Sequence, residues 1–424
     1  MSRNLVDRGI DWLGKIPEHW GFQKGKYLFR QRSERGNNIE LQLLSPTQKY
    51  GCIPQSLYEE LTGATAVKLN DKTDLNLLKT IHSGDFCISL RSFQGGFEYS
   101  IHEGVVSPAY LVFYPIYDNT YRGYYKYMFK DGAFIDKMNS FTLSLRDGKN
   151  IAFADFGNTL LPVPPIEEQQ AIADYLDKKI GEIDSAIKEA NDLIDKYKSY
   201  KQSIITKAVT KGIIPNVSMK DSGLPWIGEI PEHWRVMPNK YVMYKVKEIQ
   251  DIYNNEDILS LSTDGVKIRD LDAGGKMPTT FDGYQKVNPG RLLMCLFDID
   301  VTPRCIGLIK DEGLTSPAYS QFVVRENGYA PYYYYYYLNL DFDKILVHLA
   351  KNLRHSLTED QLGAINVLVP SLSEQKAIAD YLDDKCSQID SIIESKNNLI
   401  KQLQEYKKSI IFEYVTGKKE VPNG

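Results

Sequence analysis

Residues 162–211 read PVPPIEEQQAIADYLDKKIGEIDSAIKEANDLIDKYKSYKQSIITKAVTK, and this stretch predicts one long helix. Its apolar residues return at alternating steps of three and four, which is typical of one helix face close to a heptad repeat. The prolines fall before or at the first turn, and acidic residues at the start and lysines at the end suit the helix dipole. At 1.5 Å per residue, about 40 residues would make a rod of roughly 60 Å. The apolar stripe includes Ile172, Leu176, Ile183, Ile187 and Ile194.

A second copy of this stretch occupies residues 369–418. Glu168 corresponds to Glu374 and Thr210 to Thr416, so the offset is constant (374 − 168 = 206 and 416 − 210 = 206). Two matching apolar stripes in one chain both require burial, and packing the two helices against each other would supply it. We therefore expect a helix pair rather than two independent surface helices. The second stripe includes Ile378, Leu382, Ile389, Ile393 and Ile400.

A shorter motif also occurs twice. Residues 12–20 read Trp-Leu-Gly-Lys-Ile-Pro-Glu-His-Trp and residues 226–234 read Trp-Ile-Gly-Glu-Ile-Pro-Glu-His-Trp, and these copies contain all four tryptophans of the chain. Acid–base chemistry by the Glu-His pair is one interpretation. No second catalytic partner lies near the pair in the sequence, so we favour a structural lid whose tryptophans pack on the domain behind it.

The region between the motifs predicts mixed strands and turns, and the second half repeats the order with weaker identity. Residues 105–113 are expected to form one strand, with Tyr110 of a Ser-Pro-Ala-Tyr motif packed inside, and residues 121–138 an amphipathic helix. The chain is therefore a tandem duplicate of a globule and a long helix, in which the frame repeats while the polar loops differ. The expected segments are a first globule at 1–161, a long helix at 162–212, a second globule at 213–368 and a second long helix at 369–424.

Composition sets broad limits on the class of protein. A chain of 424 residues is too long for one ordinary core, and its net charge of −4 neither indicates nor excludes a nucleic-acid partner. The five cysteines show no CxxC spacing, which favours free thiols in a reducing compartment. The first eight residues are polar, and no apolar run reaches membrane-spanning length. We expect a soluble, cytoplasmic protein.

Catalytic and metal-binding motifs are nearly absent. No GxxxxGK[ST] phosphate loop occurs, and the six histidines show no paired ligand spacing, so we predict neither a catalytic residue nor a metal site. Loops rich in Arg, Lys, Gln, Asn and Ser/Thr follow matching strands in both halves, and such side chains can reach base edges and phosphates. The candidate DNA-binding residues are Thr47, Gln48, Lys49, Tyr50, Arg91, Ser92, Gln94, Arg146, Lys149 and Asn150 in the first half, and Thr263, Asp264, Lys267, Arg269, Arg304, Asn352, Arg354 and His355 in the second.

The two Trp-to-Trp motifs, the Pro-to-Glu-Gln heads of both long helices and the duplication itself resemble the specificity (S) subunit of type I restriction–modification systems. The match spans essentially the whole chain and departs from the usual pattern at Ser371, where a second proline is common. The resemblance implies an α+β fold with two similar target-recognition domains, each followed by a long helix. The two helices would pack as an antiparallel coiled coil with an internal pseudo-twofold.

The resemblance also implies the function and the partners. Each domain would read one half of a split, asymmetric site in double-stranded DNA, and the helix pair would dock two methyltransferase (modification) subunits and, through them, a restriction subunit. This chain would be a non-catalytic subunit that binds no cofactor. Its partners would use S-adenosylmethionine, ATP and Mg. A coiled-coil scaffold with two protein-binding globules, and an enzyme with an unrecognised site, remain open alternatives.

Overall fold

The computed structural model describes residues 3–36, 41–67, 74–88, 96–141, 151–273, 278–350 and 356–422. The chain forms two compact units. Unit 1 comprises Met1–Ala190 together with Asn398–Gly424, and unit 2 comprises Asn191–Asn397. Each unit therefore contains one globule and a segment of both long helices, α6 (Ile166–Lys211) and α10 (Leu372–Val415).

Unit 1 is built on short antiparallel strands. Its central sheet has the order β4-β11-β8-β9, and four strand pairs surround it: β1-β2, β3-β12, β5-β6 and β7-β10. The strands are β1 (Leu5–Asp7), β2 (Lys15–Pro17), β3 (Gly21–Lys24), β4 (Phe29–Gln31), β5 (Leu44–Thr47), β6 (Gly51–Pro54), β7 (Lys79–Ile81), β8 (Phe86–Ile88), β9 (Phe97–Tyr99), β10 (Gly104–Val106), β11 (Leu111–Pro115) and β12 (Leu160–Val163).

Short helices complete unit 1, and an aromatic core joins them to the sheet. Phe29, Phe86, Phe97 and Phe113 are almost fully buried, and their rings contact one another edge-on, apart from the stacked pair Phe86–Phe113. Burial of such rings dominates the energetics of a small core. The helices are α1 (Gly25–Leu28), α2 (Gln55–Thr62), the 3₁₀ turn η1 (Leu75–Leu77), α3 (Arg122–Met128), α4 (Gly132–Ser140) and α5 (Phe153–Asn158).

Unit 2 repeats this architecture. Its central sheet has the order β16-β23-β20-β21, which corresponds strand for strand to β4-β11-β8-β9. A second four-stranded sheet has the order β18-β17-β22-β19, and the pairs β13-β14 and β15-β24 match β1-β2 and β3-β12. The strands are β13 (Met219–Asp221), β14 (Glu229–Pro231), β15 (Arg235–Pro238), β16 (Met243–Val246), β17 (Ile258–Ser262), β18 (Gly265–Ile268), β19 (Gln285–Val287), β20 (Leu292–Met294), β21 (Ile306–Leu308), β22 (Gly313–Thr315), β23 (Ser320–Val324) and β24 (Asn366–Val369).

A tyrosine-rich helix fills the core of unit 2. In α7, Tyr332, Tyr333, Tyr336 and Tyr337 are fully buried, so these rings belong to the core and are not available to stack on bases. The helices of this globule are the 3₁₀ turn η2 (Asn239–Tyr241), α7 (Ala330–Phe342), α8 (Ile345–Leu349) and α9 (Glu359–Ala364).

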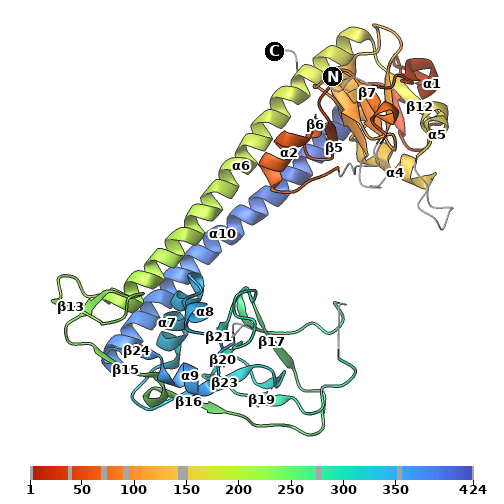
Figure 1. The fold of residues 1–424 in the computed structure, drawn as a ribbon. Helices are drawn as coiled ribbons and strands as arrows, with labels where there is room; N and C mark the ends of the chain where they lie inside the picture. The colour runs from red at the N-terminus through yellow and green to blue at the C-terminus, as the bar shows by residue number, and fades with distance from the viewer. Residues whose placement is uncertain are drawn as a thin grey trace. The chain divides into compact units, whose positions relative to one another are not determined.

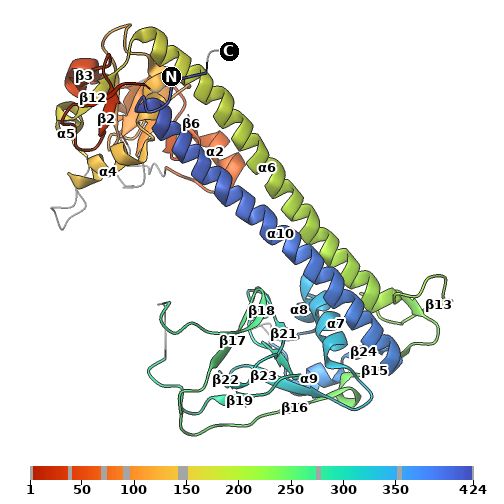
Figure 2. The same ribbon diagram turned by 180° about the vertical axis from the view of Figure 1, so that it is seen from behind.

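The two long helices pack together as an antiparallel coiled coil (Figure 1 and Figure 2). In unit 1 the ring of Tyr175 lies 4.5 Å from that of Tyr414, and Asp184 binds Lys407 at 2.7 Å, so the residue numbers run in opposite directions. In unit 2 Lys201 binds Asp390 at 2.6 Å. The two ion pairs are equivalent under the repeat (390 − 184 = 206 and 407 − 201 = 206). The predicted fold class, α+β with duplicated domains and paired helices, is confirmed.

Two local predictions are wrong. Residues 105–113 form two strands, because Ser107–Tyr110 make a turn in which the Tyr110 N–H donates to the Ser107 carbonyl at 3.0 Å. Tyr110 is half-buried rather than packed inside. The helix expected at 121–138 divides into α3 and α4, because Asp131 leaves the helical conformation and its carboxylate accepts from the Phe134 N–H at 3.1 Å as an N-cap.

Candidate nucleic-acid interface

Some of the predicted contact residues lie on equivalent hairpins of the two units. Thr47 ends β5 and residues 48–50 form the turn between β5 and β6, and Thr263 and Asp264 form the turn between β17 and β18. Three residues separate β5 from β6, whereas two separate β17 from β18, so the same frame carries different tips. Exposed tips on a rigid scaffold are suited to recognition because the strands hold them in place while their side chains remain accessible.

Hydrogen bonds between the Thr47 side chain and the backbone stabilise the turn in unit 1. The Thr47 hydroxyl accepts from the Tyr50 N–H at 3.0 Å and donates to the Gly51 carbonyl at 3.1 Å. Gln48 and Lys49 are exposed, and the Lys49 ammonium lies 4.9 Å from the Tyr50 ring centroid. This turn presents an amide, an ammonium and an aromatic face together, which are groups that can contact bases and phosphates.

The tip in unit 2 borders a groove of about 1150 Å³. One wall carries Thr263, Asp264 and Lys267 from the hairpin and Arg304 from the segment between β20 and β21. The other wall belongs to the long helices and carries Lys201, Asp390 and Glu394. The structure therefore brings four predicted contact residues together: Thr263, Asp264, Lys267 and Arg304.

The remaining predicted contacts are either apart from this groove or outside the described residues. Arg269 follows β18 and is half-buried, with its N–H donating to the Ile258 carbonyl at 2.7 Å, and it does not line the groove. The residues outside the described ranges are Arg91, Ser92, Gln94, Arg146, Lys149, Asn150, Asn352, Arg354 and His355.

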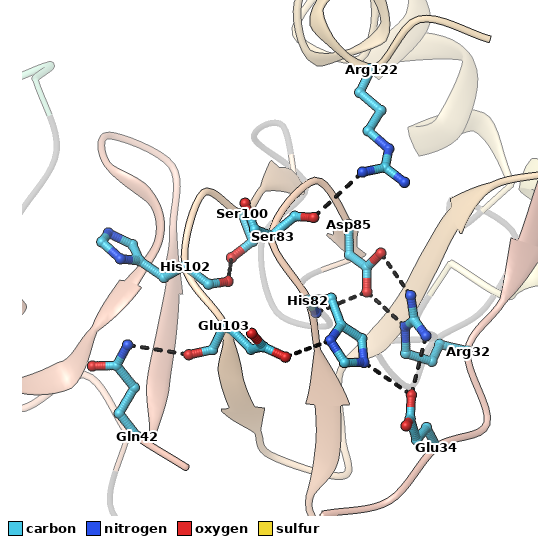
Figure 3. Close-up of polar contacts among 10 residues, drawn as sticks. All are labelled: Arg32, Glu34, Gln42, His82, Ser83, Asp85, Ser100, His102, Glu103 and Arg122. Atoms are coloured by element: carbon cyan, nitrogen blue, oxygen red, sulfur yellow. Dashed lines mark hydrogen bonds and ion pairs between the residues drawn. The ribbon is translucent and has the colours of Figure 1, made fainter. Parts of the chain in front are cut away.

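A polar cluster in unit 1 was not foreseen from the sequence (Figure 3). Arg32 binds the buried Asp85 through two hydrogen bonds of 2.7 and 3.0 Å, and His82 lies between Glu103 at 2.7 Å and Glu34 at 3.1 Å. These residues follow or precede β4, β7, β8 and β10, so the cluster joins the ends of four strands. No sequence motif marks it, because its members come together only when the strands pair.

The charge of this cluster argues against a phosphate site. Partial burial lowers the pKa of His82, but hydrogen bonds to Glu34 and Glu103 outweigh it, so the pKa is raised above its ordinary value. Three carboxylates face one guanidinium and one imidazole, which leaves no excess positive charge. The cluster therefore stabilises the first globule by linking the ends of these four strands.

The Glu-His motifs are structural as well. The Glu374 carboxylate accepts from the Trp234 indole N–H at 3.3 Å and pairs with His233 at 2.7 Å, and Glu168 makes the equivalent contacts with Trp20 and His19. Trp20 and Trp234 are buried. The motif thus fastens each lid to the first turn of a long helix.

The next residue of each helix continues this fastening. The fully buried Gln169 donates to the Pro164 carbonyl at 2.8 Å and accepts from the Tyr121 N–H at 2.8 Å. Gln375 makes the same two contacts, with Pro370 at 3.0 Å and with Tyr329 at 2.8 Å. A buried amide must be hydrogen-bonded, which explains why Gln occurs at this place in both copies.

The residues predicted for the helix-pair interface fall into two groups. Ile172, Leu176 and Ile183 pack into the core of unit 1, and Ile378 and Leu382 pack into that of unit 2. Of the others, Ile187 packs against the edge of the unit 1 core. Ile194 and Ile389 are buried, and Ile187, Ile393 and Ile400 are half-buried.

Two other kinds of site are absent from the described ranges. No group of three or more His, Cys, Asp or Glu residues there is arranged to hold a metal ion. No helix in that part of the chain has the length and hydropathy needed to cross a membrane.

Comparison with known families decides the class of the protein. A model of the type I restriction modification DNA specificity domain matches residues 24–193 and 308–405, which is more than half of the chain. The chain belongs to this specificity family. The resemblance seen in the sequence motifs is thereby confirmed, and the chain is a non-catalytic specificity subunit of a type I restriction–modification system.

Curated relatives and solved structures agree. The specificity subunit is 28% identical over 310 residues to the type I restriction enzyme MjaVIII specificity subunit of Methanocaldococcus jannaschii, covering 67% of this chain and 68% of the relative. It is 29% identical over 275 residues to the putative type I restriction enzyme MjaX specificity subunit of that organism, and the match covers 61% of this chain and 59% of that relative.

Two solved structures share its fold at 14% identity. One comes from work on complex assembly and conformational transition of a type I R-M system, with a TM-score of 0.69, covering 96% of this chain and all of that one. The other is the HsdS subunit from Thermoanaerobacter tengcongensis, with a TM-score of 0.50, and the match covers 96% of this chain and 98% of that one.

Proposed function

We propose that this specificity subunit reads a split, asymmetric site in double-stranded DNA, one half with each unit. The observation that carries the proposal is the pair of equivalent sheets, β4-β11-β8-β9 and β16-β23-β20-β21, with unlike hairpin tips beside them. Equivalent frames place equivalent loops on the DNA, and unlike loops favour unlike base sequences.

The long helices would dock the methyltransferase subunits. Leu193 and Tyr200 in unit 2 are seven residues apart on α6 and are 39% and 57% exposed. Leu399 and Tyr406 in unit 1 are their counterparts on α10 (399 − 193 = 206 and 406 − 200 = 206) and are 40% and 51% exposed. Heptad-spaced apolar residues form one stripe on a helix face, and such a stripe accepts a partner helix. Two equivalent stripes support the docking of two identical subunits.

The chemistry would reside in those partners. The methyltransferase subunits would bind S-adenosylmethionine, and a restriction subunit that joins through them would use ATP and Mg. The specificity subunit itself would contribute recognition and assembly without a bound cofactor.

Equilibrium DNA binding by the complex of this chain with its methyltransferase tests the proposal. A library with random sequence should yield two short preferred blocks separated by a spacer of fixed length. Affinity should fall steeply with salt, since phosphate contacts release counterions. Salt-insensitive capture of a protein, with no DNA preference, would support the scaffold alternative instead. Turnover by the isolated chain would support the enzyme alternative.

A further inference from the structure

Arg304 has a backbone that is held from both sides. It precedes Cys305, whose N–H donates to the buried Asp341 carboxylate at 2.7 Å and whose carbonyl accepts from the Cys295 N–H at 2.9 Å. Two residues earlier, the Thr302 carbonyl accepts from the Lys344 ammonium at 2.6 Å. The Cα of Arg304 is therefore positioned by contacts that do not involve its own side chain.

The guanidinium of Arg304 differs from those of other half-buried arginines. Arg32 and Arg291 each bind a carboxylate, Asp85 at 2.7 Å and Glu248 at 2.7 Å. Arg304 is also half-buried, yet none of its donors has an acceptor within the part of the chain that the structure describes. A guanidinium that lines a groove and has no protein acceptor among the described residues keeps its five donors available for an acceptor supplied from outside the chain.

The place of the guanidinium limits what that acceptor can be. Nη1 lies 4.0 Å from the position that a Cβ would take on Gly265, so it is beside the turn of the hairpin. The Lys267 ammonium holds the pKa of Asp264 below its ordinary value, with smaller contributions from Arg304 and Lys201, which puts Arg304 within the field of this carboxylate. Asp383, Asp390 and Glu394 line the facing wall of the groove.

The groove has no excess positive charge, because its four carboxylates are matched by Lys201, Lys267, Lys310 and Arg304, so it is not a general phosphate-binding patch. Lys267 binds Asp264 and Lys201 binds Asp390, each at 2.6 Å, so these two lysines are already neutralised and do not reinforce Arg304 toward a phosphate. Guanine offers two neutral acceptors, O6 and N7, which match the fork of an arginine. Lys310 lines the same groove, is exposed, and has no acceptor among the described residues, so it suits a phosphate.

We infer that Arg304 reads a guanine in the half-site bound by unit 2, while Lys310 contacts the DNA backbone. The inference rests on the proposed function and makes it more specific: the second half-site contains a G·C pair whose guanine is recognised by Arg304.

The test compares R304Q with K310Q in the full-length chain bound to its methyltransferase. Each complex is incubated with a DNA library randomised in both half-sites, and bound DNA is sequenced. In R304Q, the preference for guanine at one position of one half-site should fall by about 5- to 150-fold, the range expected for loss of a bidentate base contact. The other half-site should be read unchanged, which serves as an internal control of folding. K310Q should keep every base preference, weaken binding to all sequences alike and reduce the salt dependence.

Three results would overturn the inference. They are an R304Q complex that retains the wild-type preference at every position, an R304Q complex that binds all sequences uniformly more weakly, as loss of a phosphate contact would cause, and a wild-type half-site of unit 2 with no preferred guanine. A wild-type complex with no sequence preference in either half would contradict the proposed function itself, and the inference with it.

Discussion

Glu98 is a buried carboxylate in the core of unit 1. Its Oε2 lies 2.7 Å from the Lys130 ammonium, and Oε1 has no hydrogen-bond partner among the described residues. Burial raises the pKa of Glu98 from 4.5 to about 7, against the opposing effect of Lys130. The folded state therefore holds the proton more tightly than the unfolded state, and stability is lost as pH rises from about 4.5 to about 7.

We predict that Glu98→Gln raises the free energy of unfolding of unit 1 by up to about 3 kcal/mol near pH 8, since one pKa unit corresponds to about 1.4 kcal/mol. Near pH 4 the substitution should have little effect, because the carboxyl is then protonated in both states. Urea unfolding at the two pH values measures this, with the exposed Glu60→Gln as the matched control. An equal effect at both pH values would contradict the assignment.

His82 should add a second pH dependence. Its pKa is raised, so the stabilisation from its contacts is complete below its ordinary value of 6.5 and is lost as pH rises through the higher folded value. The groups that face it are Glu34, Glu103, Arg32 and Asp85.

We predict that His82→Gln lowers the melting temperature near pH 6 and has a smaller effect near pH 8.5. His102→Gln is the control, since Figure 3 shows that imidazole pointing away from the cluster. If His82→Gln shifted the melting temperature by the same amount at both pH values, the ion-pair interpretation would be wrong.

At the level of single residues, the sequence indicated which loops to consider but not how their side chains are paired. Thr263, Asp264, Lys267 and Arg304 are all candidates, yet only the structure distinguishes Arg304, which has no acceptor among the described residues, from Lys267, which binds Asp264 at 2.6 Å. Pairing depends on which segments the sheet brings together, and that depends on contacts between residues far apart in the sequence.

Among the elements, the helix pair allows a comparison within one helix. Ile389 is 5% exposed and Ile392 is 36% exposed, both on α10 in unit 2. We predict that Ile389→Asp lowers the free energy of unfolding by about 3 kcal/mol or more, because it buries an unpaired charge. Ile392→Asp should cost about 0.5 kcal/mol, as surface substitutions do. Denaturant unfolding followed by circular dichroism measures the free energy of unfolding of both variants. Equal decreases in the two variants would refute a buried helix contact at Ile389.

The exposed stripes give a second test at this scale. The double substitution of Leu193 and Tyr200 by Glu should remove one methyltransferase from the complex, since it places two charges in one of two equivalent docking stripes. The same change at Leu399 and Tyr406 should remove one as well. The mass of the complex in sedimentation measures this, with Asp195→Ala on α6 as the control. A complex that keeps both partners in each double variant would rule out these stripes as docking sites.

The ends of helices and strands show where a sequence pattern is enough to locate an element. The long helices were expected at 162–212 and 369–424 and are observed at Ile166–Lys211 and Leu372–Val415, because a heptad stripe over many turns is unambiguous. The turn at Ser107–Tyr110 and the break at Asp131 were missed, since a single hydrogen bond of 3.0 or 3.1 Å decides each.

For the whole molecule, the duplication was readable from the sequence and extends to individual atoms. Tyr124 donates to the Val415 carbonyl in unit 1, and Tyr332 donates to that of Val209 in unit 2. These residues are related by offsets of 208 and 206 (332 − 124 and 415 − 209). The constant offset of the helices is consistent with such matched contacts, whereas the unlike hairpin tips have no repeat from which to predict them.

The central claim is that each of the two units recognises its own half of the DNA site and that both units have the same scaffold. The most direct test maps methylated adenines across a genome in cells that express this chain with its methyltransferase, either as wild type or with residues 41–150 exchanged for those of another family member. The account predicts a two-part motif for the wild type, of which the exchange alters one part and leaves the other part unchanged. Methylation without a two-part motif, or an exchange that alters both parts, would contradict it.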